Sequence, residues 1–123
     1  MRTKPVGTKY LYDAIVVDVY DGDTIRLDTD LGKKIWELNE PHRLNRINAP
    51  EVRGPQREHG LISTEWLRET LPVGTRIEIE TIKGRTFVDK KGKFGRWLAE
   101  IWLGDLNIND ELVRQGLAVY QGY

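Results

Sequence analysis

The sequence predicts a mainly β fold with helices, in the α+β class, and three observations indicate it. Two stretches, residues 24–31 and 76–82, alternate apolar and polar residues with the period of a strand. Residues 61–71 have the period of an amphipathic helix. The predicted elements follow in the order three strands, a helix, two strands and a helix. Five short strands with a helix after the third favour a small closed antiparallel barrel, the OB-fold pattern, with two to three helices.

The first half of the chain holds the first three predicted strands. Residues 10–19 are rich in β-branched and aromatic residues, which favours a strand. Residues 24–31 place apolar side chains on one face and mainly charged ones on the other. Residues 34–47 form the third strand, and Pro41 within it implies an edge position or a bulge.

The second half supplies the predicted helices and the last two strands. The stretch "LISTEWLRETL", residues 61–71, has apolar pairs four residues apart and is ended by the proline that follows it. Strands are expected at residues 76–82 and 97–103. Asn109 is placed to cap a final short helix over "DELVRQ", and Gly116 is placed to end it.

Length and composition limit the classes of protein that this chain can represent. We expect a single domain over residues 1–123, with residues 1–9 as a loose N-terminal segment, and a monomer. No apolar run is long enough for a membrane span, and the first residues lack the apolar core of a signal peptide. We therefore expect either a cytoplasmic protein or a secreted one whose leader was removed before Met1. The absence of cysteine excludes disulfides and thiolate chemistry, and a net charge of zero gives no sign of a nucleic-acid partner.

Asp23 is the first candidate functional residue. In "VVDVYDGDTIRLDTDLG", residues 16–32, it falls in the same alternation phase as the apolar residues Ile25 and Leu27. One interpretation is a turn aspartate that accepts hydrogen bonds from nearby backbone amides. The alternative is a carboxylate that faces the core, which would require a cation or a metal as its partner.

Partners for such a carboxylate are available in "HRLNRINAPE", residues 42–51. Carboxylate, amide and carbonyl oxygens, such as that of Asn48, are ligands for a hard cation such as Ca²⁺. The guanidinium of Arg43 suits bidentate contact with phosphate, and an acid such as Glu51 could act as general base on water. The alternative is a surface salt bridge between Arg43 and Glu51, which would contribute little.

A basic cluster lies near the start of the last predicted strand. Residues 83–96 contain six basic residues and one acid, together with three glycines. A solvated hairpin tip would explain most of these lysines. Arg96 differs because it stands at the start of a strand, from which it could reach the same end of the barrel as Arg43.

Four segments of the sequence together resemble the staphylococcal nuclease family. They are "DGDT" at 21–24, "RLNRINAPE" at 43–51, "KFGRWLAEIW" at 93–102 and "NDELVRQGLA" at 109–118. They occur in the order of the family and extend over nearly the whole chain. The resemblance implies an OB-type barrel and hydrolysis of phosphodiester bonds in DNA or RNA with Ca²⁺, preferably in single strands.

The resemblance also implies roles for individual residues. Asp23, Asn48 and the backbone carbonyl of Ala49 correspond to metal ligands, and Asp21 corresponds to a residue close behind the metal. Arg43 and Arg96 correspond to the arginines that hold phosphate, and Glu51 to the carboxylate that handles the attacking water. The positions that correspond to substrate contacts are Lys93, Phe94 and Tyr120.

Departures from the family pattern keep an alternative open. The best-known member has an aspartate at the position of Asn48, so this chain has one negative charge fewer for Ca²⁺, which weakens binding. Phe94 stands where a tyrosine hydroxyl is common. The sequence therefore predicts a Ca²⁺-dependent nuclease, with a module that binds nucleic acid without cleaving it as the alternative and a protein-interaction domain as a third possibility. The presence of Asp23, Arg43, Glu51 and Arg96 together favours catalysis.

Overall fold

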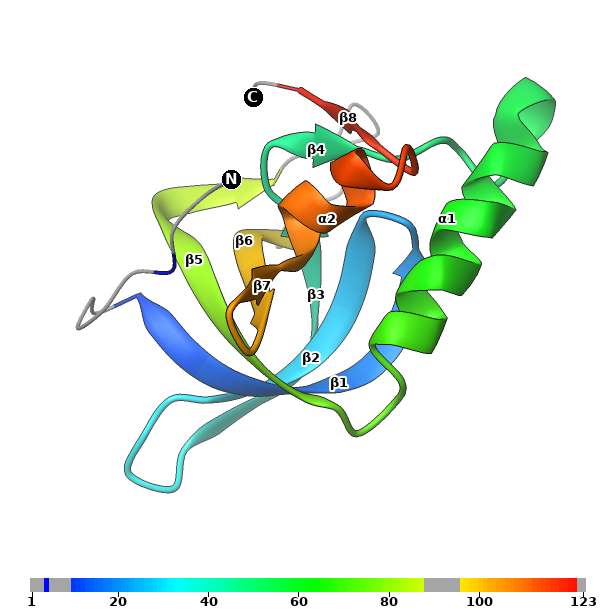
Figure 1. Ribbon diagram of the computed structural model, residues 1–123. Coiled ribbons are helices and arrows are strands. Elements are labelled where there is room, and N and C mark those ends of the chain that lie inside the picture. Colours follow the sequence, from blue (N-terminus) through cyan, green and yellow to red (C-terminus); the bar gives the residue numbers. More distant parts are fainter. Residues whose placement is uncertain (1–3, 5–9, 88–95, 122–123) are drawn as a thin grey trace.

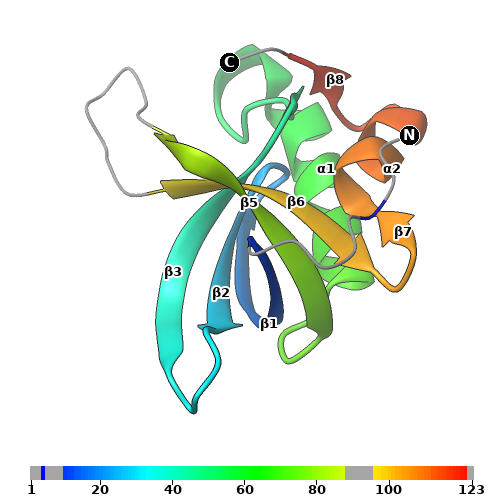
Figure 2. The ribbon, with the colours of Figure 1, turned by 90° about the vertical axis from the view of Figure 1, so that its left-hand side faces the viewer.

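A closed barrel of five strands forms the centre of the molecule (Figures 1 and 2). The computed structural model describes Lys4 and residues 10–87 and 96–121, without the side chains of residues 83–87 and 96. The barrel strands are β1 (Leu11–Asp21), β2 (Thr24–Asp30), β3 (Trp36–Leu44), β5 (Arg76–Phe87) and β6 (Arg96–Leu103). This confirms the predicted five-stranded barrel in the α+β class.

The barrel is mixed, whereas the sequence pattern favours an antiparallel one. The strands follow the order β3-β2-β1-β5-β6, and each of these neighbours is antiparallel to the next. A parallel pairing of β3 with β6, from His42 opposite Trp97 to Leu44 opposite Ala99, closes the ring. Pro41 lies opposite Arg26 of β2, just before β3 gains this second partner. Pro41 therefore occupies the edge position that was predicted for it.

The predicted third strand is interrupted before its end. It stops at Leu44, and β4 (Ile47–Asn48) resumes after a turn in which Arg46 has a φ of 68°. This left-handed backbone conformation cannot continue a strand. β4 pairs with β8 (Val119–Tyr120), and β7 (Leu106–Asn107) pairs with the end of β6.

The first helix begins earlier than its apolar pattern predicts. A short 3₁₀ turn, η1 (Gly54–Gln56), leads into α1 (Arg57–Thr70), which ends two residues before Pro72. The helix lies along the outside of β1 (Figure 1). Its first turn carries polar side chains that face solvent, so this turn has no apolar spacing that would mark it in the sequence.

The predicted cap of the last helix was wrong by two residues. α2 (Ile108–Arg114) is capped by Asn107, whose side-chain oxygen accepts a hydrogen bond from the backbone N–H of Asp110 at 2.8 Å. Asn109 is instead fully buried, and its amide donates to the carbonyl of Ala99 at 3.0 Å. Gly116 has a φ of 76° just beyond the helix, as expected for the residue that ends it.

Apolar residues from every barrel strand and from both helices form one core. On β2 the inward residues are Ile25, Leu27 and Thr29, as the alternation predicts. The prediction was wrong at both ends of this segment, because Thr24 is also buried and Leu31 lies beyond the strand with 47% of its surface exposed. Among the described residues, no helix has the length and the apolar character that crossing a membrane requires. The predicted loose segment, residues 1–9, lies outside the described residues except for Lys4.

Candidate active site

The turn between β1 and β2 brings two aspartates to one end of the barrel. Asp23 is buried, with 8% of its surface exposed, as its alternation phase predicts. Gly22 between the aspartates is also buried, and a Cβ there would lie 2.8 Å from the Cβ of Ala49 and 2.9 Å from that of Ser63. Gly22 is therefore required because the turn packs closely against these neighbours.

The carboxylate of Asp23 is held by hydrogen-bond donors from several segments. Its Oδ2 lies 2.7 Å from Nη1 of Arg43 and accepts a hydrogen bond from the backbone N–H of Ala49 at 2.9 Å. Its Oδ1 accepts from the hydroxyl of Thr24 at 3.3 Å. The sequence analysis missed Thr24, although its place directly after the aspartate was a usable signal.

Arg43 bridges two of the residues that the sequence predicts as metal ligands. Its Nη1 is paired with Asp23, and its Nη2 donates to Oδ1 of Asn48 at 2.9 Å. The side chains of Arg43 and Asp23 are only 7% and 11% exposed. This is a buried ion pair, so the alternative of a surface salt bridge between Arg43 and Glu51 is wrong.

Asp21 lies beside this pair, and its carboxyl is less acidic than an ordinary aspartate. Its Oδ1 accepts a hydrogen bond from the backbone N–H of Asp23 at 3.1 Å. Burial and the negative charge of Asp23 raise the pKa of Asp21 to about 7. The carboxyl of Asp21 is therefore about half protonated at neutral pH, and a cation that approached it would favour its charged form.

Glu51 stands apart from the buried pair. It follows Pro50 on the loop after β4, and its exposed carboxylate makes no hydrogen bond or ion pair with other described residues. The backbone of this loop rests on Gly60 of α1, where any Cβ would overlap the carbonyl oxygen of Glu51. Glu51 is thus held by its backbone, while its side chain is exposed to solvent.

The remaining predicted residues divide into two groups. Arg96 is the first residue of β6, two residues before Leu98, which lies opposite Arg43 in the parallel pairing. The side chain of Arg96, and Lys93 and Phe94 altogether, lie outside the described part of the chain. The hydroxyl of Tyr120 donates to Oδ1 of Asp110 at 2.8 Å.

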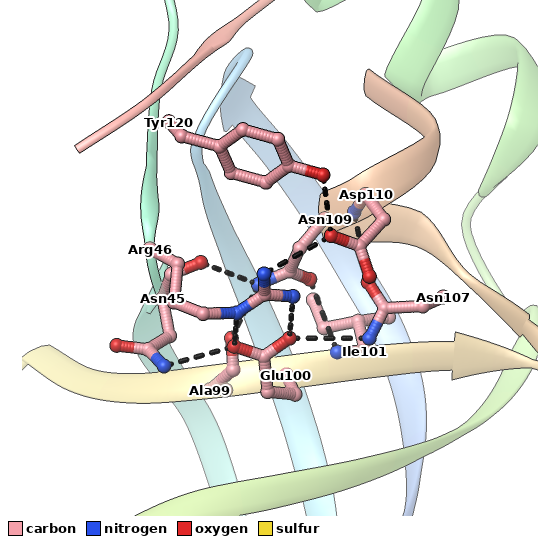
Figure 3. A network of polar contacts seen from close by, with 9 residues as sticks. All are labelled: Asn45, Arg46, Ala99, Glu100, Ile101, Asn107, Asn109, Asp110 and Tyr120. Carbon is pink, nitrogen blue, oxygen red and sulfur yellow. Dashed lines mark hydrogen bonds and ion pairs between the residues drawn. The ribbon is translucent and has the colours of Figure 1, made fainter. Parts of the chain in front are cut away.

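Tyr120 belongs to a partly buried polar network beside the site (Figure 3). At its centre, Arg46 contacts Glu100 of β6 through Nε and Nη2, each at 2.8 Å, and Asp110 of α2 through Nη1 at 3.0 Å. Asn107 also donates to Glu100, at 3.1 Å. Because Arg46 lies between Arg43 and Asn48 in the chain, this network fixes the segment that carries both. The sequence analysis missed this role of Arg46 and Glu100.

A cleft adjoins Asn48 and Ala49. Its volume is about 160 Å³, and it lies between residues 48–50 and residues 116–119. The segment after α2 therefore forms one wall beside the candidate site. The sequence analysis did not predict this wall.

The donor atoms at this end of the barrel fit a hard cation. The described residues contain no cluster of three or more His, Cys, Asp or Glu side chains that could hold a metal. A cation here would therefore depend on the Asp21 and Asp23 carboxylates together with amide and carbonyl oxygens of Asn48 and Ala49. Such mixed oxygen sets are typical of Ca²⁺, and the lower charge implies weak binding.

Comparison with known proteins identifies the family. The family model for staphylococcal nuclease homologues matches residues 41–123. The chain is 33% identical over 115 residues to a thermonuclease of Staphylococcus intermedius, covering 91% of this chain and 59% of the relative. It is 30% identical over 106 residues to a thermonuclease of Staphylococcus hyicus, covering 84% and 56%. An uncharacterised protein of Methanocaldococcus jannaschii is 28% identical over 135 aligned positions, covering 94% and 62%.

The chain thus spans about three fifths of the length of these relatives. The family match covers more than half of the chain and includes Arg43, Asn48, Glu51 and Arg96. Together with the OB-type barrel and the paired Asp23 and Arg43, these matches show that the chain belongs to the staphylococcal nuclease family.

Proposed function

We propose that this protein is a Ca²⁺-dependent nuclease that hydrolyses phosphodiester bonds in DNA or RNA and prefers single strands. The observation that carries the proposal is the buried ion pair of Asp23 with Arg43, whose Nη2 also contacts Asn48. A buried arginine beside excess carboxylate charge is costly for stability. Such an arrangement is typical of a site for an anionic substrate and a cation.

Different residues of the chain have separate roles in the proposed reaction. Attack on a phosphodiester places negative charge on the phosphate oxygens, and arginine N–H donors aimed at them stabilise the transition state more than the ground state. Arg43 and Arg96 supply these donors. The solvent-exposed carboxylate of Glu51 accepts the proton of the attacking water.

Asp23, Asn48 and the carbonyl of Ala49 would hold Ca²⁺, with Asp21 close behind them. When bound, the ion supplies positive charge that stabilises the charge developing on the phosphate. Arg43 already contacts Asp23 and Asn48. If Ca²⁺ took these oxygens, Arg43 would have to release at least one of them, and its N–H donors would then be free to contact phosphate.

The test is cleavage of single-stranded DNA by the full chain, with Ca²⁺ or with a chelator. We expect cleavage only with Ca²⁺, and a loss of about 100-fold or more in Glu51→Gln, since a general base typically contributes that much. Glu65→Gln is the matched control, because Glu65 is an exposed acid on the outer face of α1. Binding without cleavage under every condition would instead support the alternative, a non-catalytic nucleic-acid-binding module.

A further inference from the structure

The inside of the barrel contains a second cavity, separate from the candidate active site. Its volume is about 190 Å³, and each of the five barrel strands contributes to its wall. The inward-facing residues that define it are Tyr12, Thr29, His42, Thr81 and Trp97. Arg43 follows His42 directly in β3, so the side chains of these two residues project from opposite faces of the strand. The cavity and the candidate active site are therefore separated by β3.

An unfilled space here is unexpected for a barrel of this size. Barrels with few strands are normally filled by their own side chains. Here Thr29 and Thr81 are small, and the hydroxyl oxygen of Thr29 has no hydrogen-bond partner among the described residues although only 2% of Thr29 is exposed. A buried polar atom without a partner costs on the order of 1–3 kcal/mol. The wall of the cavity therefore includes a buried polar atom that lacks a partner, beside volume that the side chains leave unfilled.

The walls combine aromatic rings with hydrogen-bonding groups. Tyr12 and Trp97 supply rings, and Glu37 supplies a carboxylate at the half-exposed rim. His42 is directed by the contact of its Nδ1 with the carbonyl of Glu40 at 2.9 Å. With burial lowering the pKa of His42 to about 4, the ring is neutral and its Nε2 remains an acceptor. These groups match a flat heteroaromatic ring that carries both donors and acceptors.

We propose that this cavity binds one nucleobase of a single-stranded nucleic acid, stacked on the aromatic walls and hydrogen-bonded by Thr29 and Glu37. The identity of the ligand rests on the proposed function, which supplies single-stranded nucleic acid as the substrate. A cavity of roughly 150 Å³ is sufficient to hold benzene, so 190 Å³ accommodates a single base. OB-type barrels bind single strands by stacking bases on aromatic side chains.

The bound base belongs to a nucleotide other than the one whose phosphate meets Arg43. Thr29 and Thr24 are five residues apart on β2, which is on the order of 17 Å along a strand, and Thr24 lies opposite Arg43. Lys33 and Lys34 are exposed in the hairpin beyond Leu31, which lines the cavity. Their charges are available to the phosphates of a strand that enters there.

The experiment measures binding of a single-stranded DNA of about eight nucleotides, within the usual site size of one OB fold. It is done in chelator, so that binding is observed without Ca²⁺-dependent cleavage. Thr81→Phe fills the cavity with a ring of the chain itself. We expect binding on the order of 10-fold weaker, since one stacked base contributes about that much or more. The melting temperature should stay equal or rise, because a void is filled.

Two further variants and one NMR measurement test whether the loss of binding comes from the cavity itself. Val73→Phe adds the same ring at an exposed turn and should leave binding unchanged. Thr29→Val removes only the unpartnered hydroxyl, and should weaken binding without lowering stability. Added cytidine should shift the indole N–H resonance of Trp97 in the parent protein and leave it unchanged in Thr81→Phe.

The outcomes separate this inference from the proposed function. If the protein cleaves DNA but Thr81→Phe binds as tightly as the parent, the nucleobase site is wrong and the nuclease stands. If Thr81→Phe weakens binding but no condition gives cleavage, the nucleobase site stands and the nuclease is wrong. Absence of any binding by the parent protein overturns the nucleobase site.

Discussion

Arg43 contacts both Asp23 and Asn48, the two side chains proposed as metal ligands. It neutralises the carboxylate of Asp23 and donates to the amide oxygen of Asn48. If these oxygens hold Ca²⁺ as proposed, arginine and metal would compete for them. This competition, together with the neutral side chain of Asn48, would make Ca²⁺ binding weak.

Arg43→Gln should therefore destabilise the protein and strengthen its response to Ca²⁺. Removing one partner of a buried ion pair costs about 3–5 kcal/mol, so the melting temperature without Ca²⁺ should fall. Added Ca²⁺ should raise the melting temperature further in this variant than in the parent, because no arginine has to be displaced. The measurement is thermal unfolding over a Ca²⁺ series.

Arg26→Gln serves as the control, since Arg26 contacts only the exposed carbonyl of Asn39 among the contacts described. It should change neither stability nor the Ca²⁺ response by much. An equal Ca²⁺-induced shift in Arg43→Gln and the parent would contradict the competition.

His42 should make the stability depend on pH. Its pKa falls from 6.5 to about 4 on folding because the ring is buried. The unfolded chain therefore binds more protons between these values, and the stability that neutral His42 contributes is lost as the pH falls from 6.5 toward 4. The full loss is about 3 kcal/mol, at 1.36 kcal/mol per pKa unit.

The check compares His42→Phe with the parent by urea unfolding across this pH range. The difference in unfolding free energy should move in favour of the parent as the pH rises. The raised pKa of Asp21 makes the stability fall as the pH rises, which is opposite to the effect of His42. Because Asp21 is present in both proteins, its effect cancels in the difference between them. A pH-independent difference would show that His42 does not titrate as proposed.

Single residues show how far the sequence alone can predict this site. Alternation placed Asp23 in phase with the apolar residues of β2, but it left open whether this carboxylate is a turn aspartate bonded to backbone amides or a buried group that needs a positive partner. It could not identify Arg43 as that partner, because the pairing depends on the register that places Thr24 opposite Arg43. Register between strands follows from packing of the whole barrel and is weakly marked in any one segment.

At the level of elements, the short strand β4 connects the candidate site to the rest of the molecule. It pairs with β8, and the preceding Arg46 is held by Glu100 of β6 and Asp110 of α2. The sequence predicted one long strand here. The break at Arg46 was not predictable because a left-handed arginine is uncommon and, in this chain, is stabilised by buried carboxylates distant in the sequence.

Glu100→Gln should loosen β4 as well as destabilise the protein. Glu100 is fully buried, and its carboxylate accepts from Arg46, Asn45 and Asn107. Neutralising it leaves Arg46 partly uncompensated, at a cost of about 3–5 kcal/mol. The backbone N–H of Ala49, which donates to Asp23, should then exchange with solvent faster than the fall in global stability explains.

Hydrogen exchange followed by NMR measures this effect directly. The control is Glu69→Gln, an exposed residue of α1, which should leave the exchange of Ala49 unchanged. If Ala49 exchanges at the rate set by global unfolding in both variants, Arg46 and Glu100 stabilise the fold without positioning the site.

At the scale of the whole molecule, the net charge of zero limits how the protein attracts nucleic acid. Long-range steering is weak, so the proposed binding would depend on local arginines and on stacking. If Arg43 and Arg96 make the two proposed phosphate contacts, a plot of log affinity against log salt should have a slope of about −1.4 for a single strand.

Fluorescence anisotropy with a labelled oligonucleotide over a salt series measures this slope. A slope steeper than about −3 would mean that several lysines of residues 83–93 also contact phosphate. Neutralising Lys33 and Lys34 together should reduce the slope only if the strand also passes the hairpin beside the barrel cavity.

The parallel pairing of β3 with β6 has a consequence for synthesis of the chain. Residues 96–103 leave the ribosome after all the other barrel strands, and until then both β3 and β5 present unpaired edges. Open edges of this kind are templates for pairing with other chains. The nascent protein is therefore most vulnerable to aggregation just before its last long strand emerges, and chaperones that shield strand edges should matter most at that stage.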